Sequence, residues 1–291
     1  MNAQALMETA RALVAGDKGL LAMDESNPTC DRRFARAGIP QTVEARRAYR
    51  ELILTTGGLG DCINGATLYD ETIRQHKKDG TSFVKILLDA GVIPGIKVDI
   101  GAQDLAGHPG ERITEGLDGL RDRLKDYFQM GARFAKWRAV ITMGEGLPSW
   151  GCIEANAHAL ARYAVLCQEV GLVPIVEPEV LVDGDQSLEQ RRAATESVLQ
   201  RVFAQLHAQG AMLEGMILKP NMALSGLACA TQASVDEVAE EAAMGAGLFL
   251  CSCDPAASPG NMGRQGSQSG SGATGSSSSG ALQRGRAPRR I

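Results

Sequence analysis

The sequence predicts an α/β fold, a (β/α)8 TIM barrel that is incomplete at its C-terminal strands. Six short apolar runs each end in polar or ionisable residues, and stretches with helical spacing lie between them. The chain of 291 residues is long enough for one barrel, which typically needs about 250. Strands that alternate with helices form a parallel sheet, and charged residues at the carboxyl ends of its strands are typical of a barrel's active-site face.

Each predicted strand is a run of mainly apolar residues that stops abruptly at polar or charged groups. The first run stops at Asp24, the third at Lys97 and the fifth at Glu177. The six runs cover residues 19–23, 63–68, 94–96, 133–138, 172–176 and 213–218. Stretches with helical spacing separate these runs. We therefore expect the runs to pair as neighbouring parallel strands.

Between the runs, apolar residues recur every three or four positions, which indicates helices with one buried face. The predicted helices cover residues 3–14, 42–54, 113–130, 153–170 and 187–209. The last one begins with Ser187 and Gln190 in the spacing of a capping box. An open doubly wound sheet is the competing architecture. However, no G-x-G-x-x-G follows the opening strand, and we interpret residues 57–60 as a turn before a strand.

Lys219 ends an apolar run and is a candidate nucleophile. Burial and a nearby second cation both lower the pKa of a lysine, and the run that contains Lys136 and Arg138 supplies such a cation. A lysine with some free amine near neutrality can form a Schiff base with a carbonyl substrate. The alternative is that each lysine only ends a strand and extends its ammonium group into solvent.

Composition narrows the class of protein without selecting a function. The net charge of −4 gives no electrostatic basis for binding nucleic acid or an anionic membrane. No apolar run has the length of a transmembrane helix, and no signal peptide is evident. The seven cysteines are odd in number and scattered, and the four histidines lack H-x-x-x-H or H-x-H spacing. We therefore expect a cytoplasmic protein with reduced thiols and no metal site.

Six motifs follow one another along the chain, most of them at predicted strand ends. They are LAMDES (21–26), PGIKVD (94–99), EGLDGL (115–120), FAKWR (134–138), VEPE (176–179) and LKPNM (218–222). In this order they resemble the Schiff-base (class I) fructose-bisphosphate aldolases. The residues at 27–30, Asn-Pro-Thr-Cys, resemble the bacterial and algal branch. The resemblance implies a glycolytic and gluconeogenic lyase that cleaves fructose 1,6-bisphosphate without a metal or another cofactor.

The resemblance assigns catalytic roles to four residues. It makes Lys219 the Schiff-base lysine, which captures the ketose carbonyl so that the iminium can accept the electrons of the broken C3–C4 bond. Asp24 takes the proton of the C4 hydroxyl or orients the group that does, and Glu177 transfers protons while the imine forms. Lys136 lowers the pKa of the nucleophile and stabilises developing oxyanions. Considered alone, Asp24 and Glu177 could equally be solvated carboxylates at strand ends.

Four further residues are assigned to binding by the same resemblance. Lys97, Arg138 and Ser26 resemble the residues that hold the phosphate at the aldehyde end of the sugar, and Glu179 supports Glu177. Arg138 could instead belong to a structural ion pair. The family also implies sugar phosphates as the partners and a homotetramer as the assembly.

The C-terminal part of the chain departs from the family pattern. We trace the resemblance from Met1 to about Ala233, and predict a barrel domain over 1–254. Residues 255–291 contain 8 Gly, 8 Ser, 3 Pro and no acidic residue, which predicts a disordered low-complexity tail. A frameshifted or replaced C-terminus is our hypothesis for its origin, and an acquired anion-binding arm is the alternative. The alternative function is an impaired barrel that only binds phosphosugars or joins an oligomer.

Overall fold

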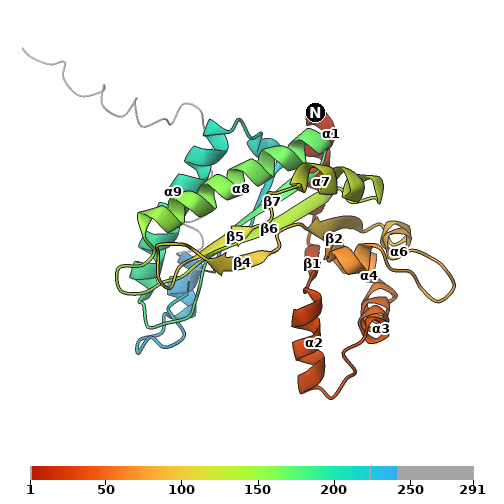
Figure 1. Cartoon of the computed structure of the whole chain (residues 1–291), viewed down its shortest axis with the longest axis horizontal. Helices are drawn as coiled ribbons and strands as arrows, with labels where there is room; N and C mark the ends of the chain where they lie inside the picture. Colours follow the sequence, from red (N-terminus) through yellow and green to blue (C-terminus); the bar gives the residue numbers. More distant parts are fainter. Residues whose placement is uncertain (1, 223, 241–291) are drawn as a thin grey trace, which may run out of the picture. The chain divides into compact units, whose positions relative to one another are not determined.

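A computed structural model describes residues 2–222 and 224–240 of the chain. Six parallel strands form one sheet in the order β1-β2-β3-β6-β7-β8, and β4 and β5 form a separate antiparallel hairpin (Figure 1). The strands are β1 (Gly19–Met23), β2 (Ile63–Leu68), β3 (Ile93–Lys97), β4 (Gly101–Asp104), β5 (Arg112–Glu115), β6 (Phe134–Ile141), β7 (Val173–Val180) and β8 (Ile217–Leu218). The predicted parallel α/β sheet of an incomplete barrel is thereby confirmed.

One of the following helices precedes the first strand, and the others lie between strands. They are α1 (Ala3–Leu13), α2 (Asn27–Arg36), α3 (Val43–Leu54), α4 (Leu59–Cys62), α5 (Asp70–Ile73), α6 (Phe83–Asp89), α7 (Leu120–Gln129), α8 (Trp150–Val170) and α9 (Leu188–Ala208), with a 3-10 turn at Leu213–Gly215. Helices α7, α8 and α9 lie along one side of β6 and β7 (Figure 1). No helix in the described part of the chain is both long and apolar enough to cross a membrane.

The predicted helix ends agree with the capping groups. Thr42 and Ser187 each accept a hydrogen bond from a backbone N–H of the first turn, and Ser187 with Gln190 completes the expected capping box. One predicted helix was wrong in its first turns, because residues 112–115 form β5 and the helix α7 begins only at Leu120. Helices α2, α4, α5 and α6 and the β4–β5 hairpin were not predicted, and the predicted turn at 57–60 runs into α4. The predicted tail at 255–291 lies outside the described residues.

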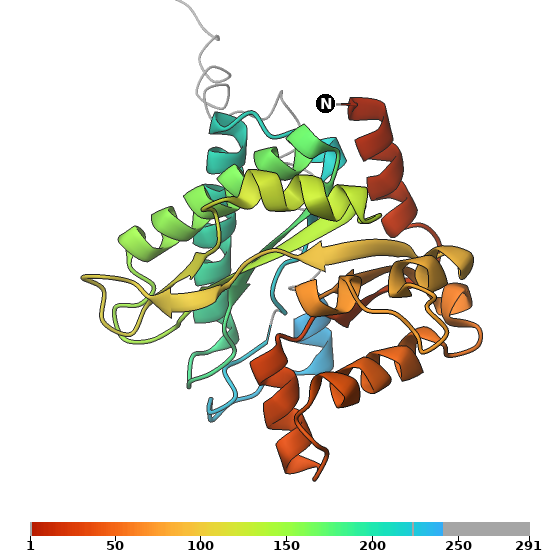
Figure 2. The same ribbon diagram turned by 45° about the vertical axis from the view of Figure 1, so that its right-hand side comes forward.

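Alternation along β6 and β7 separates two apolar clusters. Ala135, Trp137 and Val176 point to the helices and join the larger cluster with α8. Phe134 and Ile175 are set on the opposite, concave face, where they pack with Leu6, Ala10 and Leu13 of α1 and with Val173. Helix α1 therefore closes the amino-terminal end of the sheet, at the end away from α2 (Figure 2). We call this second cluster the apolar floor.

Two glycines make room for the apolar floor. A Cβ at Gly95 of β3 would lie 2.2 Å from ring atoms of Phe134, and one at Gly65 of β2 would lie 2.6 Å from Leu13. Real Cβ atoms do not approach other atoms so closely. The strands β2 and β3 can therefore pack against Phe134 only with glycine at these positions.

Gly95→Ala should lower the free energy of unfolding by about 2 kcal/mol, because the added methyl forces the ring of Phe134 or the strand to move. Urea unfolding of the purified variant measures this loss. Gly19→Ala is the matched control, since Gly19 also lies in a strand and a Cβ added there would have no heavy atom within 4 Å. Equal stabilities for the two variants would contradict the packing argument.

Candidate active site

The period of two along each strand places four predicted site residues directly above the apolar floor. Lys97 lies two positions after Gly95, and Lys136 lies two positions after Phe134. Glu177 follows Ile175 and Lys219 follows Ile217 at the same interval. Successive alternate residues of a strand share one face. The carboxyl half of the concave face therefore carries a polar layer formed by four different strands or strand ends.

Glu177 contacts two lysines of this layer. Its carboxylate is almost completely buried, with 5% of the side chain exposed, and Oε1 accepts a hydrogen bond from the Lys219 ammonium. Oε2 lies 3.7 Å from the nitrogen of Lys136 and has no hydrogen-bond partner. A carboxylate placed between two amines can exchange protons with either one. The geometry therefore brings the two predicted lysines to opposite oxygens of the same acid.

Lys136 also contacts Asp24, the first residue after β1. Its nitrogen lies 2.6 Å from Asp24 Oδ2, and both side chains are mostly buried. Burial by itself lowers the pKa of Lys136, but the negative charges of Asp24 and Glu177 outweigh it and raise the pKa above 10.5. Lys136 is therefore a charged ammonium at neutral pH. It links Asp24 to Glu177, so that Lys219, Glu177, Lys136 and Asp24 form a continuous chain of contacts.

Arg138 and Glu179 lie one step further toward the carboxyl ends of the strands. The Arg138 guanidinium donates to Glu179, and 42% and 31% of the two side chains are exposed. Burial lowers the pKa of Arg138, but the hydrogen bond and charge of Glu179 outweigh it and raise the pKa. Lys97 donates to Asp99 at 2.5 Å. Lys97 ends β3 and Arg138 lies in the carboxyl half of β6, where an anionic group of a ligand can reach the partly exposed Arg138.

Ser26 lies at the start of α2, two residues after Asp24. Its hydroxyl is 3.1 Å from that of Thr29, and its backbone carbonyl accepts the N–H groups of Thr29 and Cys30. The structure thus places Ser26 at the amino-terminal turn of a helix of ten residues, next to a predicted catalytic acid. Its predicted contact with phosphate stays a prediction.

Arg50 pairs with Glu25, the residue after the predicted acid Asp24, and was not predicted from the sequence. It is 2% exposed and donates to the Glu25 carboxylate at 2.7 Å and to the Glu25 carbonyl at 3.2 Å. Burial raises the pKa of Glu25, but Arg50 and Arg33 outweigh it and the pKa is lowered. Arg50 shares the buried face of α3 with Leu54, at the spacing of one helical turn. A charged residue on the apolar stripe of a predicted helix was therefore the available sign of a buried ion pair.

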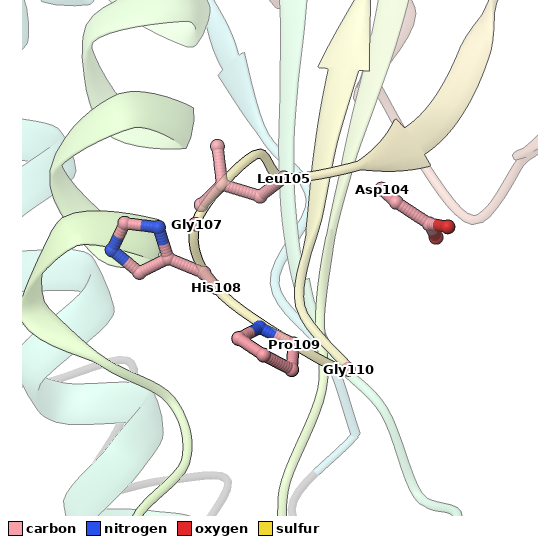
Figure 3. Close-up of a pocket in the computed structure, with 6 residues that line it drawn as sticks. All are labelled: Asp104, Leu105, Gly107, His108, Pro109 and Gly110. Carbon is pink, nitrogen blue, oxygen red and sulfur yellow. The ribbon is translucent and has the colours of Figure 1, made fainter.

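The pocket drawn in Figure 3 lies in the loop between β4 and β5, away from the predicted chemistry. Residues of this loop line it, from Asp104 to Gly110, and none of them is a predicted site residue. The imidazole of His108 turns toward α8, whereas Asp104 points to the other side (Figure 3). A shallow hollow made by one loop does not bring together groups from several strands, and we assign it no role.

The described side chains of the concave face pair as acids with cations. Asp24 pairs with Lys136, Asp99 with Lys97, and Glu179 with Arg138, while Glu177 lies between two lysines. Among residues 2–222 and 224–240, no three His, Cys, Asp or Glu side chains gather as a metal ion would require. The set can exchange protons with a bound molecule and can hold an anionic group.

Comparison with known families agrees with this arrangement. A sequence model of the class-I fructose-bisphosphate aldolases matches residues 5–279, which is most of the chain. The chain belongs to this family. The match extends beyond Ala233, so the predicted limit of the family sequence at that residue was wrong.

Individual relatives of the aldolase family are similar over most of the chain. A probable class 1 fructose-bisphosphate aldolase of Xanthomonas campestris pv. campestris is 59% identical over 260 residues, which are 89% of this chain and 77% of that protein. The cytosolic fructose-bisphosphate aldolase 6 of Arabidopsis thaliana is 50% identical over 224 residues, 77% of this chain and 63% of that protein.

A solved structure shares the fold. The fructose-bisphosphate aldolase of Plasmodium falciparum, crystallised in complex with TRAP and a small-molecule inhibitor, superposes with a TM-score of 0.82 at 43% identity. The superposition covers 83% of this chain and 70% of that one. The incomplete parallel barrel is therefore the aldolase fold.

Proposed function

We propose that this aldolase cleaves fructose 1,6-bisphosphate reversibly to dihydroxyacetone phosphate and glyceraldehyde 3-phosphate through a Schiff base on Lys219. The observation that carries the proposal is the chain of contacts from Lys219 through Glu177 and Lys136 to Asp24. It connects the amine of Lys219 with a buried acid, Glu177, and through Lys136 with a second carboxylate, Asp24. Imine formation and bond cleavage each need one such proton acceptor.

Lys219 supplies the nucleophile in this proposal. Its nitrogen attacks the C2 carbonyl, and the resulting carbinolamine loses water to give an iminium. Glu177, whose Oε1 contacts this nitrogen, accepts the proton that the amine loses and returns one to the departing hydroxyl. The side chain of Lys219 is 56% exposed, compared with 13% for Lys136, so a ketose can reach the nitrogen of Lys219 more easily.

Asp24 supplies the base for the cleavage step. It takes the proton of the C4 hydroxyl, the C3–C4 bond breaks, and its electrons pass to the iminium to form an enamine. The aldehyde leaves as glyceraldehyde 3-phosphate. Protonation of the enamine at C3 and hydrolysis of the iminium then release dihydroxyacetone phosphate and restore the amine. Lys136, held between Asp24 and Glu177, stabilises negative charge on whichever of the two acids is ionised.

Binding of the aldehyde-end phosphate is proposed for Lys97, Arg138 and Ser26. Support comes from the position of the two cations near the carboxyl ends of β3 and β6, and from Ser26 at a helix start. Glu179 holds the Arg138 guanidinium in this proposal. The reaction needs no metal, so a chelator should leave activity unchanged. A cytoplasmic site of action is proposed from the name of the cytosolic plant relative, and the homotetramer stays a prediction that light scattering can test.

Asp24→Asn should still form the Schiff base but should lose at least about 10²-fold in cleavage of the bisphosphate, because the amide cannot accept the C4 hydroxyl proton. Reductive trapping with borohydride measures the first step, and a coupled assay of triose phosphate release measures the second.

Glu177→Gln is the matched comparison for Asp24→Asn. It removes the other carboxylate that faces Lys136 and should slow imine formation itself. If Asp24→Asn lost trapping and cleavage to the same extent as Glu177→Gln, the two acids would not have the separate roles proposed here.

A further inference from the structure

Asp99 is a buried carboxylate just beyond β3, with 4% of its side chain exposed. Its Oδ1 accepts hydrogen bonds from the Lys97 ammonium at 2.5 Å and from the backbone N–H of Gly101 at 3.2 Å. Its Oδ2 accepts the backbone N–H of Arg138 at 3.4 Å. One side chain therefore contacts two of the residues proposed to bind the aldehyde-end phosphate.

The course of the main chain explains why a side chain is needed there. Val98 still donates to the Lys136 carbonyl of β6, at 3.1 Å, as the next step of the parallel ladder. Ile100 instead donates to Glu115 of β5, because the chain has turned into the β4–β5 hairpin. The N–H of Arg138 is thus left beside a gap in the ladder, and the carboxylate of Asp99 fills it.

Two groups of Asp99 hold the ammonium of Lys97. Its nitrogen donates to the Asp99 carbonyl at 3.1 Å as well as to the carboxylate, and its side chain is 18% exposed. A lysine has a flexible four-carbon stem, so an ammonium without such partners samples many positions. A cation that is already in place loses less conformational freedom when an anion binds.

We propose that Asp99 is a positioning residue that holds Lys97 and the backbone of Arg138 in the geometry that binds the aldehyde-end phosphate. The inference rests on the proposed function, since it concerns the same substrate. Two effects of Asp99 oppose each other: its charge repels a phosphate, and its contacts order the cations that attract one. The compact double contact to Lys97 and the filled ladder position favour the ordering effect.

Asp99→Asn should therefore weaken binding of the aldehyde-end phosphate and leave binding of the rest of the substrate unchanged. Cleavage of fructose 1,6-bisphosphate is compared with that of fructose 1-phosphate, which lacks only this phosphate. We expect kcat/KM for the bisphosphate to fall by about tenfold, mainly through KM, and that for the monophosphate by less than about twofold. Equal losses for both substrates, or tighter binding of the bisphosphate, would overturn the proposal.

A double-mutant cycle separates positioning from a general structural effect. If Asp99 acts through Lys97, then Asp99→Asn should cost much less in a Lys97→Met background than in the wild type. Asp104→Asn is the matched control, since it removes the same charge from an exposed position of the adjoining strand β4. Asp99→Glu keeps the charge and should fall between wild type and Asp99→Asn. Losses that simply add in the cycle would contradict the proposal.

Equilibrium binding of hexitol 1,6-bisphosphate makes the test independent of turnover. This probe has both phosphates but no carbonyl, so it neither forms a Schiff base nor is cleaved. Wild-type protein that binds the probe but does not cleave the substrate would contradict the proposed function alone. Asp99→Asn that binds the probe as tightly as the wild type, or wild-type protein that does not bind it, would contradict the role of Asp99.

Discussion

Lys219→Met should reduce cleavage of fructose 1,6-bisphosphate by at least about 10⁴-fold, because without this amine the iminium that accepts the electrons of the broken C3–C4 bond does not form. The fold should survive this change. The side chain of Lys219 is 56% exposed, and methionine has a similar length. The backbone N–H of Lys219, which donates to Val176 of β7 at 2.9 Å, is retained.

The measurement for Lys219→Met is a coupled assay of triose phosphate release, with thermal unfolding as the check on folding. Lys85→Met is the matched control. It removes an exposed ammonium that pairs with Asp89 on the surface of α6, and we expect unchanged activity. Substantial cleavage by Lys219→Met at wild-type stability would mean that another residue is the nucleophile.

Lys136→Met should have the second largest effect and should act on both activity and stability. The substitution leaves Asp24 and Glu177, both nearly buried, without the cation that lies between them. Removing one partner of a buried ion pair costs about 3 kcal/mol in the free energy of unfolding. Cleavage should fall by a factor on the order of 10² to 10³, because charge that develops on oxygen loses its nearest cation.

The stability difference between wild type and Lys136→Met should shrink as the pH rises through the titration of Lys136. The pKa of Lys136 is raised in the folded chain, since the charges of Asp24 and Glu177 outweigh burial. Its contribution is therefore fully present below the unfolded-state value and is lost as the pH rises through the higher folded-state value. Urea unfolding should give a constant difference at neutral pH and a shrinking one above pH 10.5. Lys125→Met, an exposed change on α7, is the control and should show little effect at any pH. A difference that grew with rising pH would contradict the buried pair.

The strands of the sheet were predictable where an apolar run is followed directly by polar or charged residues. The runs at 19–23 and 63–68 coincide with β1 and β2. The β4–β5 hairpin was not predictable in the same way. Its strands have four residues each, and Gly101–Asp104 contains no apolar run. Such short strands depend on pairing with each other, and Ile113 and Thr114 also fitted the start of a helical pattern.

The members of the candidate site were predictable, but their pairing was not. Motifs at strand ends identified Lys136, Glu177 and Lys219, and strand periodicity places all three on one face. Which acid contacts which lysine depends on the stagger between strands, which sets Arg138 opposite Glu177 across β6 and β7. Asp99 lay within a recognised motif, but its role emerges only from the gap in the ladder that its carboxylate fills.

Reductive trapping tests the central claim most directly. The protein is incubated with dihydroxyacetone phosphate and borohydride, digested, and mapped by mass spectrometry, with a chelator present in a parallel sample. Both Lys136 and Lys219 contact Glu177, so the map distinguishes the two amines that share this acid. We predict one ketose adduct on Lys219, unaffected by the chelator. An adduct on Lys136 or on another lysine, or none at all, would contradict the proposed mechanism.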